Sequence, residues 1–441
     1  MIGMRGRLCL WLVFLLCFSS PSHATPKVQQ LQGPGGMQVY LLESHSNPMV
    51  EMRLVARGGS AYDPPGKAGL AAVTAWMFNE GSETMDVATF QERLEFHGIV
   101  MDATASLETV VVRLTTLTEH LDEAWSRLAD GLLRPRLAEK DFARALEEQR
   151  ALIIKNREQP QTQASLLLHR SLYPNHPYGS PVSGTLEGLA NIDLADARRF
   201  HADTFHAPAM VLTVAGDMDL PRLQELLHRH LAELNPSPSP RPAIPEVARE
   251  TAADPARVQH LEMDLPQTTL LLGTIGIHRR DPDYYALYVL NQILGGSGLN
   301  SRLSMEIREK RGLTYGVYSR FVPLSREGPF IVAMKTKTES SNEALGLLRQ
   351  ILAQTANEGV SERELQEVVR YLTGSFPLHL DGLGKLSAIW GTIGFYQLGE
   401  DYLEQWPEKI RAVTREDIVR VARRVLNADR FYTVTVGKNR Q

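Results

Sequence analysis

Apolar runs along the chain predict short β-strands in both halves of the sequence. They cover residues 39–42, 50–55 and 110–114 in the first half, and residues 270–275 and 330–334 in the second. Between them lie long stretches with apolar residues at helical spacing, such as 137–156 and 340–356. Strands joined by hairpins, with helices grouped in blocks, predict an α+β fold in which a mainly antiparallel sheet packs against helices.

The clearest break in this pattern is the segment NPSPSPRPAIP at residues 235–245. Its prolines oppose both helix and central strand, and they favour an extended, semi-rigid connector. We therefore predict an N-terminal domain at residues 31–235, a proline-rich linker at 236–256 and a C-terminal domain at 257–441.

The segments that precede the linker and end the chain are related in sequence. Aligned without a gap, residues 192–216 pair with residues 413–437, and Gly216 meets Gly437. Each segment reads as a polar start, a helix and a strand, and this matched order at one constant offset indicates a duplicated domain. The alternative is a chance alignment of two generic helix-strand units. We predict two homologous copies of one α+β domain.

The N-terminus has the pattern of a cleavable secretory signal at residues 1–24. Arg5 and Arg7 precede an apolar run at residues 8–18, and a small-x-small triplet ends at Ala24. The run has about eleven residues, too few to cross a hydrocarbon core of about 30 Å as a helix. We predict export without a stable membrane anchor, into the periplasm if the cell is Gram-negative. The alternative is a short membrane anchor.

Composition and charge exclude several classes of function. The 441 residues include 47 Lys and Arg against 51 Asp and Glu, so the formal net charge is -4. No basic excess is present to neutralise phosphates, and nucleic acid is not expected as a partner. Both cysteines, Cys9 and Cys17, fall in the predicted signal, which excludes thiolate chemistry from the mature chain. The sequence also lacks a GxSxG elbow, a Walker loop and a dinucleotide fingerprint.

Five segments, in order along the mature chain, carry a family resemblance. They are GKAGLAAVTAWMFNEGSETM from Gly66, LEFHGIVMDATAS from Leu94, HPYGSPVSGTLEGLANIDLADARRFHADTF from His176, SRLSMEIREKRGLTYGVYS from Ser301 and FPLHLDGLGKLSAIWG from Phe376. Together they resemble the pitrilysin-like, or inverzincin, metallopeptidases. The resemblance extends over nearly the whole mature chain.

In active members of that family, the first segment carries HxxEH on a helix. Two histidines one turn apart bind zinc, and the glutamate between them activates water. The resemblance puts Ala72, Ala75 and Trp76 at these positions in this chain. Alanine and tryptophan donate no lone pair to zinc, so no metal is expected on this chain. Trp76 is bulky enough to fill the vacated space.

The third zinc ligand of the family is a glutamate on a later helix. The resemblance puts Leu152 at that position, although Glu147 and Glu148 lie close enough for a small shift of the alignment. A single glutamate would not restore the site, because both histidine positions and the catalytic position are also changed.

The second half of the chain keeps Arg308 and Tyr315, which resemble the family's Arg-Tyr motif. In the family these side chains reach across to the zinc-bearing half and hold the substrate's backbone carbonyl. A guanidinium and a phenol both donate hydrogen bonds to oxygen, and both can stabilise the oxyanion that forms when water attacks a peptide bond. The alternative is a solvated helix arginine and a half-buried strand tyrosine.

Family members of this size often work as two chains, one with HxxEH and one with the Arg-Tyr pair. The resemblance therefore implies an exported, zinc-free subunit of a heterodimeric metallopeptidase, inactive alone. Its partner would be a homologous subunit that carries HxxEH and the zinc, and its substrate a peptide. One alternative is a non-enzymatic peptide-binding or assembly protein of the same fold. A weaker one is an active peptidase with zinc bound elsewhere.

Overall fold

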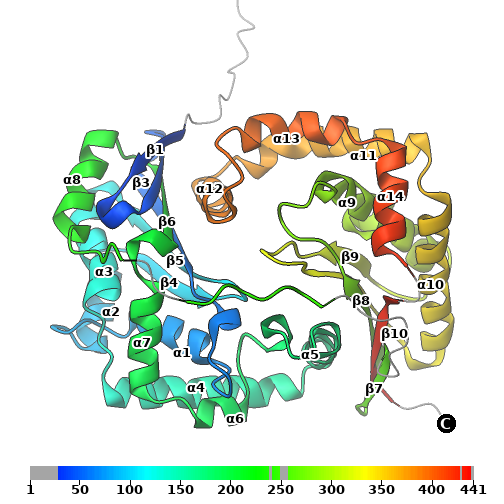
Figure 1. Cartoon of the computed structure of the whole chain (residues 1–441), viewed down its shortest axis with the longest axis horizontal. Helices are drawn as coiled ribbons and strands as arrows, with labels where there is room; N and C mark the ends of the chain where they lie inside the picture. Colours follow the sequence, from blue (N-terminus) through cyan, green and yellow to red (C-terminus); the bar gives the residue numbers. More distant parts are fainter. Residues whose placement is uncertain (1–27, 238–240, 249–256, 428–429, 439–441) are drawn as a thin grey trace, which may run out of the picture.

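The computed structural model describes residues 28–237, 241–248, 257–427 and 430–438. The predicted signal, with Cys9 and Cys17, lies outside the described residues. Figure 1 shows two halves, each a sheet with helices, that face each other. Among the described residues, no helix is long and apolar enough to cross a membrane.

The N-terminal sheet has six strands in the order β1-β2-β6-β3-β5-β4. Its strands are β1 (Val28–Gln32), β2 (Gln38–Glu43), β3 (Met49–Arg57), β4 (Val100–Ala105), β5 (Thr109–Leu117) and β6 (Met210–Gly216). Neighbouring strands are antiparallel except β2 and β6, which are parallel. The apolar pattern does not predict β1, because its side chains are only half-buried or exposed.

The C-terminal sheet has five strands in the order β7-β11-β8-β10-β9. Its strands are β7 (Val258–Glu262), β8 (Gln267–Ile275), β9 (Val317–Phe321), β10 (Pro329–Lys337) and β11 (Tyr432–Gly437). Only β7 and β11 are parallel neighbours. The order and directions match those of β2, β6, β3, β5 and β4, so among the described strands β1 is the one without a counterpart in the C-terminal half. The predicted α+β fold with two homologous domains is confirmed.

The aligned segments of the two halves begin with the same local structure. Helix α7 (Leu194–Thr204) follows the capping residue Asp193, and helix α14 (Arg415–Val425) follows Thr414. The Asp193 carboxylate accepts a hydrogen bond from the third amide of its helix, and the Thr414 hydroxyl does the same in α14. In both helices the side chain of that third residue bonds back to the capping residue's amide, which completes a capping box.

We expect Asp193→Ala and Thr414→Ala each to lower the free energy of unfolding by about 1 kcal/mol, because each leaves helix amides without an acceptor. Urea denaturation would measure both losses. Glu92→Ala is the control, since Glu92 is an exposed residue within a helix and should cost less than about 0.5 kcal/mol. Unchanged stability in both cap variants would contradict the expectation.

Helices cover one face of each sheet. In the N-terminal half, this layer holds α2 (Val87–Phe96), α3 (Leu121–Leu133) and α8 (Leu220–Leu231). In the C-terminal half, it holds α9 (Tyr284–Asn291), α10 (Ser341–Glu358) and α14. The remaining helices are α1 (Leu70–Trp76), α4 (Glu139–Arg157), α5 (Pro160–Leu172), α6 (Leu186–Ala190), α11 (Glu362–Ser375), α12 (Leu383–Tyr396) and α13 (Tyr402–Arg411).

Each half of the chain contributes one helix that packs on the sheet of the other half. Helix α5 packs on β8 and β11 of the C-terminal sheet, and α12 packs on β3 and β6 of the N-terminal sheet. Leu168 of α5 shares a core with Leu271 and Val434, while the Trp390 ring of α12 lies 5.1 Å from the Tyr40 ring. Both helices lie in the region between the halves in Figure 1. Each sheet is therefore covered on its second face by the other half of the chain.

The described part of the proline-rich segment, residues 241–248, contains neither helix nor strand. Arg241 donates hydrogen bonds to the carbonyl oxygens of Arg57 and Phe200 in the N-terminal half, at 3.1 and 3.0 Å. On the other side, Arg326 of the C-terminal half donates from Nε to the Ile244 carbonyl at 3.0 Å. The segment therefore contacts both halves.

Candidate functional site

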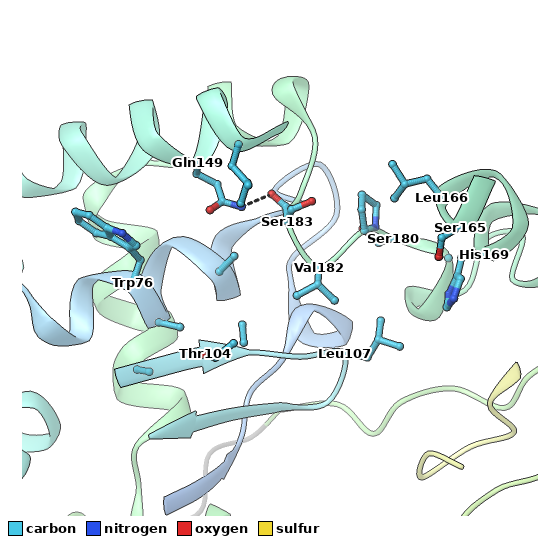
Figure 2. Close-up of a pocket in the computed structure, with 17 residues that line it drawn as sticks. Trp76, Thr104, Leu107, Gln149, Ser165, Leu166, His169, Ser180, Val182 and Ser183 are labelled. Atoms are coloured by element: carbon cyan, nitrogen blue, oxygen red, sulfur yellow. Dashed lines mark hydrogen bonds between the residues drawn. The ribbon is translucent and has the colours of Figure 1, made fainter. Parts of the chain in front are cut away.

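The four positions of the degenerate zinc motif line one cavity of about 540 Å³. Ala72, Ala75 and Trp76 come from α1, and Leu152 comes from α4. The other walls are the end of β4, one face of α5 and the segment 179–183. Figure 2 shows Trp76 between α1 and α4, and His169 at the opposite end of the cavity.

The three motif positions of helix α1 lie on the helix face that borders the cavity. Residues at i, i+3 and i+4 share one face of a helix, which places Ala72, Ala75 and Trp76 together. The opposite face buries Leu70 and Val73 against neighbouring helices. The side chains that face the cavity are therefore those of the motif.

A carboxylate fixes the start of α1. Asp63 accepts hydrogen bonds from the amides of Gly69 and Ala71, both at 2.8 Å. Burial raises the pKa of Asp63 to about 7, although both amide hydrogen bonds act in the opposite direction. Gly69 has φ 109° and approaches Gly184 so closely that a side chain on either residue would collide with its neighbours. These contacts position α1 against the cavity wall.

Helix α4 contributes Leu152 and, one turn earlier, Gln149. The Gln149 side chain is 9% exposed and donates a hydrogen bond to the Ser183 carbonyl at 2.7 Å, which joins two walls of the cavity. Glu147 and Glu148 do not line the cavity. Their side chains are 72% and 55% exposed and lie near Arg150 and Arg144. Sequence reasoning missed Gln149, although its helical spacing from Leu152 could have indicated it.

Helix α5 contributes Ser165, Leu166 and His169. The His169 ring donates from Nδ1 to the Tyr178 carbonyl at 3.4 Å. Burial lowers the pKa of His169, so the imidazole is neutral at pH 7. No sequence signal indicated this residue, because α5 reaches the cavity only through its packing on the C-terminal sheet.

The donor set of this cavity does not fit a zinc ion. His169 is the one histidine in the lining, and the lining contains no carboxylate. The other polar side chains are amides or hydroxyls, which are poor ligands for zinc compared with imidazole, carboxylate or thiolate. Among the residues that the structure describes, no group of three or more His, Cys, Asp or Glu side chains could hold a metal ion.

Trp76 does not fill the vacated space, contrary to the expectation from its size. Its indole lies between α1 and α4 at one side of the cavity (Figure 2). There the Arg144 guanidinium lies over the ring at 4.9 Å from its centre. Arg144 is itself paired with Glu80 and lies 3.9 Å from Asp141. This packing holds the indole to the side and leaves a cavity lined mostly by apolar side chains.

We expect the chain lacking residues 1–24 to hold no stoichiometric zinc. The double variant Ala72→His, Trp76→His should also fail to hydrolyse peptides, because Ala75 provides no carboxylate to activate water and Leu152 provides no third ligand. Elemental analysis and a peptide hydrolysis assay measure these two outcomes. The comparison variant carries Ala75→Glu and Leu152→Glu in addition to the two histidines, and therefore has all four side chains of the family's zinc motif. One tightly held zinc in the unmodified chain, or robust hydrolysis by the double variant, would contradict the expectation.

Arg308 and Tyr315 do not line this cavity. Arg308 lies in the helical turn Ser304–Glu309, and its guanidinium is 3.5 Å from the Glu309 carboxylate. Tyr315 precedes β9 and is 89% exposed, so the alternative of a half-buried strand tyrosine is wrong. Its backbone is nevertheless fixed, because the neighbouring Thr314 hydroxyl donates to the Lys335 carbonyl at 2.6 Å.

Two family models match the chain. The model described as insulinase (peptidase family M16) matches residues 38–186, and the model described as peptidase M16 inactive domain matches residues 191–372. A crystal structure of a peptidase M16 inactive domain from Pseudomonas fluorescens is 31% identical, with a TM-score of 0.88. The match covers 94% of this chain and 98% of that chain.

The curated proteins similar to this chain include one named as a non-peptidase homolog and others named as uncharacterized zinc proteases. The non-peptidase homolog YmxG of Helicobacter pylori is 28% identical over 359 residues, covering 81% of each chain. An uncharacterized zinc protease of Streptomyces coelicolor is 26% identical over 413 residues, covering 92% of this chain and 88% of that protein.

Proposed function

Because this chain belongs to the M16 peptidase family, we propose that it is the zinc-free subunit of a two-chain metallopeptidase. It is a non-catalytic M16 homolog by itself. In the complex, Arg308 and Tyr315 donate hydrogen bonds to a peptide carbonyl held at the zinc site of a homologous subunit that carries HxxEH. Both chains are exported, and they work in the periplasm if the cell is Gram-negative.

The exposure of Tyr315 carries this proposal. Its side chain is 89% exposed, yet the flanking Thr314 and Val317 are only 8% and 6% exposed. The Gly316 amide also donates to the Thr314 hydroxyl at 3.0 Å. A phenol presented to solvent on a fixed backbone is pre-organised to meet a ligand or another chain.

The backbone that carries Arg308 is held in the same way. Ile307 is fully buried, and its carbonyl accepts a hydrogen bond from the Leu313 amide at 3.1 Å. The Arg308 side chain is 37% exposed, and among the described residues Glu309 is the one carboxylate that pairs with it. The guanidinium therefore keeps donors for an oxygen from outside this chain. Since this chain's own cavity has neither a set of zinc ligands nor a carboxylate at the catalytic position, the donors support zinc-dependent catalysis only with a second chain.

Reconstitution tests the proposal. The chain lacking residues 1–24 is purified alone and mixed with a homologous HxxEH subunit, and hydrolysis of a quenched fluorescent peptide is followed. We expect hydrolysis by the mixture, and none by this chain alone. A partner with its HxxEH glutamate replaced by glutamine is the control, and it should abolish the activity. A partner that is equally active with and without this chain would contradict the proposal.

A second candidate is peptide binding without hydrolysis, and the edge of the N-terminal sheet favours it. β4 is the last strand of that sheet, and no described strand pairs with its outer edge. Its residues Ala103 and Ala105 line the apolar cavity. An extended peptide can pair with such an edge and place side chains in a neighbouring pocket. Saturable binding of the uncleaved peptide by this chain alone, with no gain of hydrolysis in the mixture, would favour this candidate.

A further inference from the structure

A second cavity, of about 530 Å³, lies where the two halves meet. It shares no lining residue with the cavity at the degenerate motif. The N-terminal half contributes Arg57, at the end of β3. The connecting segment contributes Glu246, and the C-terminal half contributes three groups of residues: 278–280 after β8, 324–327 between β9 and β10, and 395–397 at the end of α12.

The lining of this cavity is unusually rich in arginine. It holds Arg57, Arg279, Arg280 and Arg326, but only two carboxylates, Glu246 and Glu327. The pair Arg326 and Glu246 is joined by a salt bridge. The other three arginines have no carboxylate partner among the described residues. The cavity is therefore locally positive in a chain whose formal net charge is -4.

Aromatic residues hold two of these arginines in place. Arg279 donates to the hydroxyls of Tyr284 and Tyr402, and its guanidinium lies 4.4 Å from the centre of the Tyr284 ring. Its Nε is shielded from solvent and has no hydrogen-bond partner in the described structure. The Arg57 guanidinium lies 4.8 Å from the Phe395 ring. These contacts fix the guanidinium planes but leave N–H donors unused.

We propose that this cavity binds an oxyanion, a phosphate or carboxylate group, between the two halves of the chain. The planar guanidinium fork matches the oxygens of either group with two parallel hydrogen bonds. The volume is that of a small-molecule site. Glu108 lies next to the lining residues Ser325 and Tyr396 but does not itself line the cavity. Its carboxylate accepts hydrogen bonds from the Tyr396 hydroxyl and the Ser325 amide, so it does not neutralise the arginines by direct contact. The ligand would contact both halves, independently of any partner subunit.

Calorimetric titration of the chain lacking residues 1–24 tests this proposal at fixed, low ionic strength. One arm uses inorganic pyrophosphate. The other arm compares two forms of one short peptide, the first with a free C-terminal carboxylate and the second with a C-terminal amide. Arg57 and Arg280 are replaced together by glutamine, because neither side chain makes a hydrogen bond in the described structure and the fold should tolerate the change. Arg363→Gln is the matched control, since Arg363 is 86% exposed on α11 and pairs, within the described part of the chain, with Glu367 alone.

We expect saturable binding in at least one arm, at least about tenfold weaker in the Arg57→Gln, Arg280→Gln variant and unchanged in Arg363→Gln. Binding of pyrophosphate would identify a free phosphate compound as the ligand class. Binding of the free peptide but not the amide would identify a peptide terminus. Saturable binding in neither arm, or equal binding by the double variant, would overturn the proposal. Circular dichroism confirms that each variant is folded.

Discussion

Replacing Arg308 by alanine in a reconstituted complex is expected to lower peptide hydrolysis by about 10²-fold to 10³-fold, the usual effect of losing one oxyanion donor. Tyr315→Phe should act similarly, because it removes only the hydroxyl. If the hydrogen bond strengthens in the transition state, the loss should appear mainly in kcat. If the bond only holds the substrate, the loss should appear mainly in KM. Arg308→Lys should also be impaired, since a point charge cannot replace the planar fork.

The same segment provides matched controls for both variants. Arg311 is 42% exposed and pairs with Glu306, so Arg311→Ala should leave turnover unchanged. Tyr318 is 43% exposed on β9, and Tyr318→Phe should also be silent. Gel filtration must show that each variant still pairs with the partner. Full activity after replacement of both Arg308 and Tyr315 would mean that this chain has only a structural role in the complex.

Replacing Glu108 by alanine is expected to lower the free energy of unfolding by about 3 to 5 kcal/mol. Glu108 is 1% exposed and follows β4 in the N-terminal half. Its carboxylate accepts hydrogen bonds from the hydroxyls of Tyr178 and Tyr396, and from the Ser325 amide at 3.0 Å. Ser325 and Tyr396 belong to the C-terminal half, so one carboxylate joins both halves. Its removal leaves these donors without an acceptor.

The tyrosines stay protonated donors at physiological pH. Burial and the nearby Glu108 carboxylate raise the pKa of both Tyr178 and Tyr396. Urea denaturation would measure the loss for Glu108→Ala. Glu108→Gln keeps an acceptor oxygen and should lose less, while Glu119→Ala, at a side chain that is 74% exposed, is the surface control. A loss below about 1 kcal/mol for Glu108→Ala would mean that the halves do not depend on this contact.

The duplication and the shared helix face of the motif positions could be anticipated from the sequence because both depend on local pattern. Gly216 and Gly437 end equivalent strands, as the alignment of the two segments predicts. The spacing of Ala72, Ala75 and Trp76 places them on one helix face wherever that helix packs. The assignment of Leu152 needed the family resemblance, and the structure puts it in the same cavity.

The orientation of individual side chains was harder to anticipate. The size of Trp76 suggested that it would occupy the cavity, but Arg144 holds the indole to one side. Tyr315 stands next to a strand in sequence, yet Thr314 anchors the backbone and leaves the ring exposed. Each outcome depends on a contact made by a residue outside the named motif positions, Arg144 in one case and Thr314 in the other.

The sequence by itself predicted two α+β domains, and the family resemblance put Ala72, Ala75 and Trp76 at the zinc-motif positions and Arg308 and Tyr315 at the Arg-Tyr motif. Only the tertiary structure decided that α5 and α12 each cover the other half's sheet and that Glu108 joins the halves. It alone also showed that three arginines of the second cavity have no carboxylate partner among the described residues. The physical reason is that periodicity reports which face of an element is buried, but not which element buries it. Charges likewise pair through space, so their partners follow from the packing and not from their order along the chain.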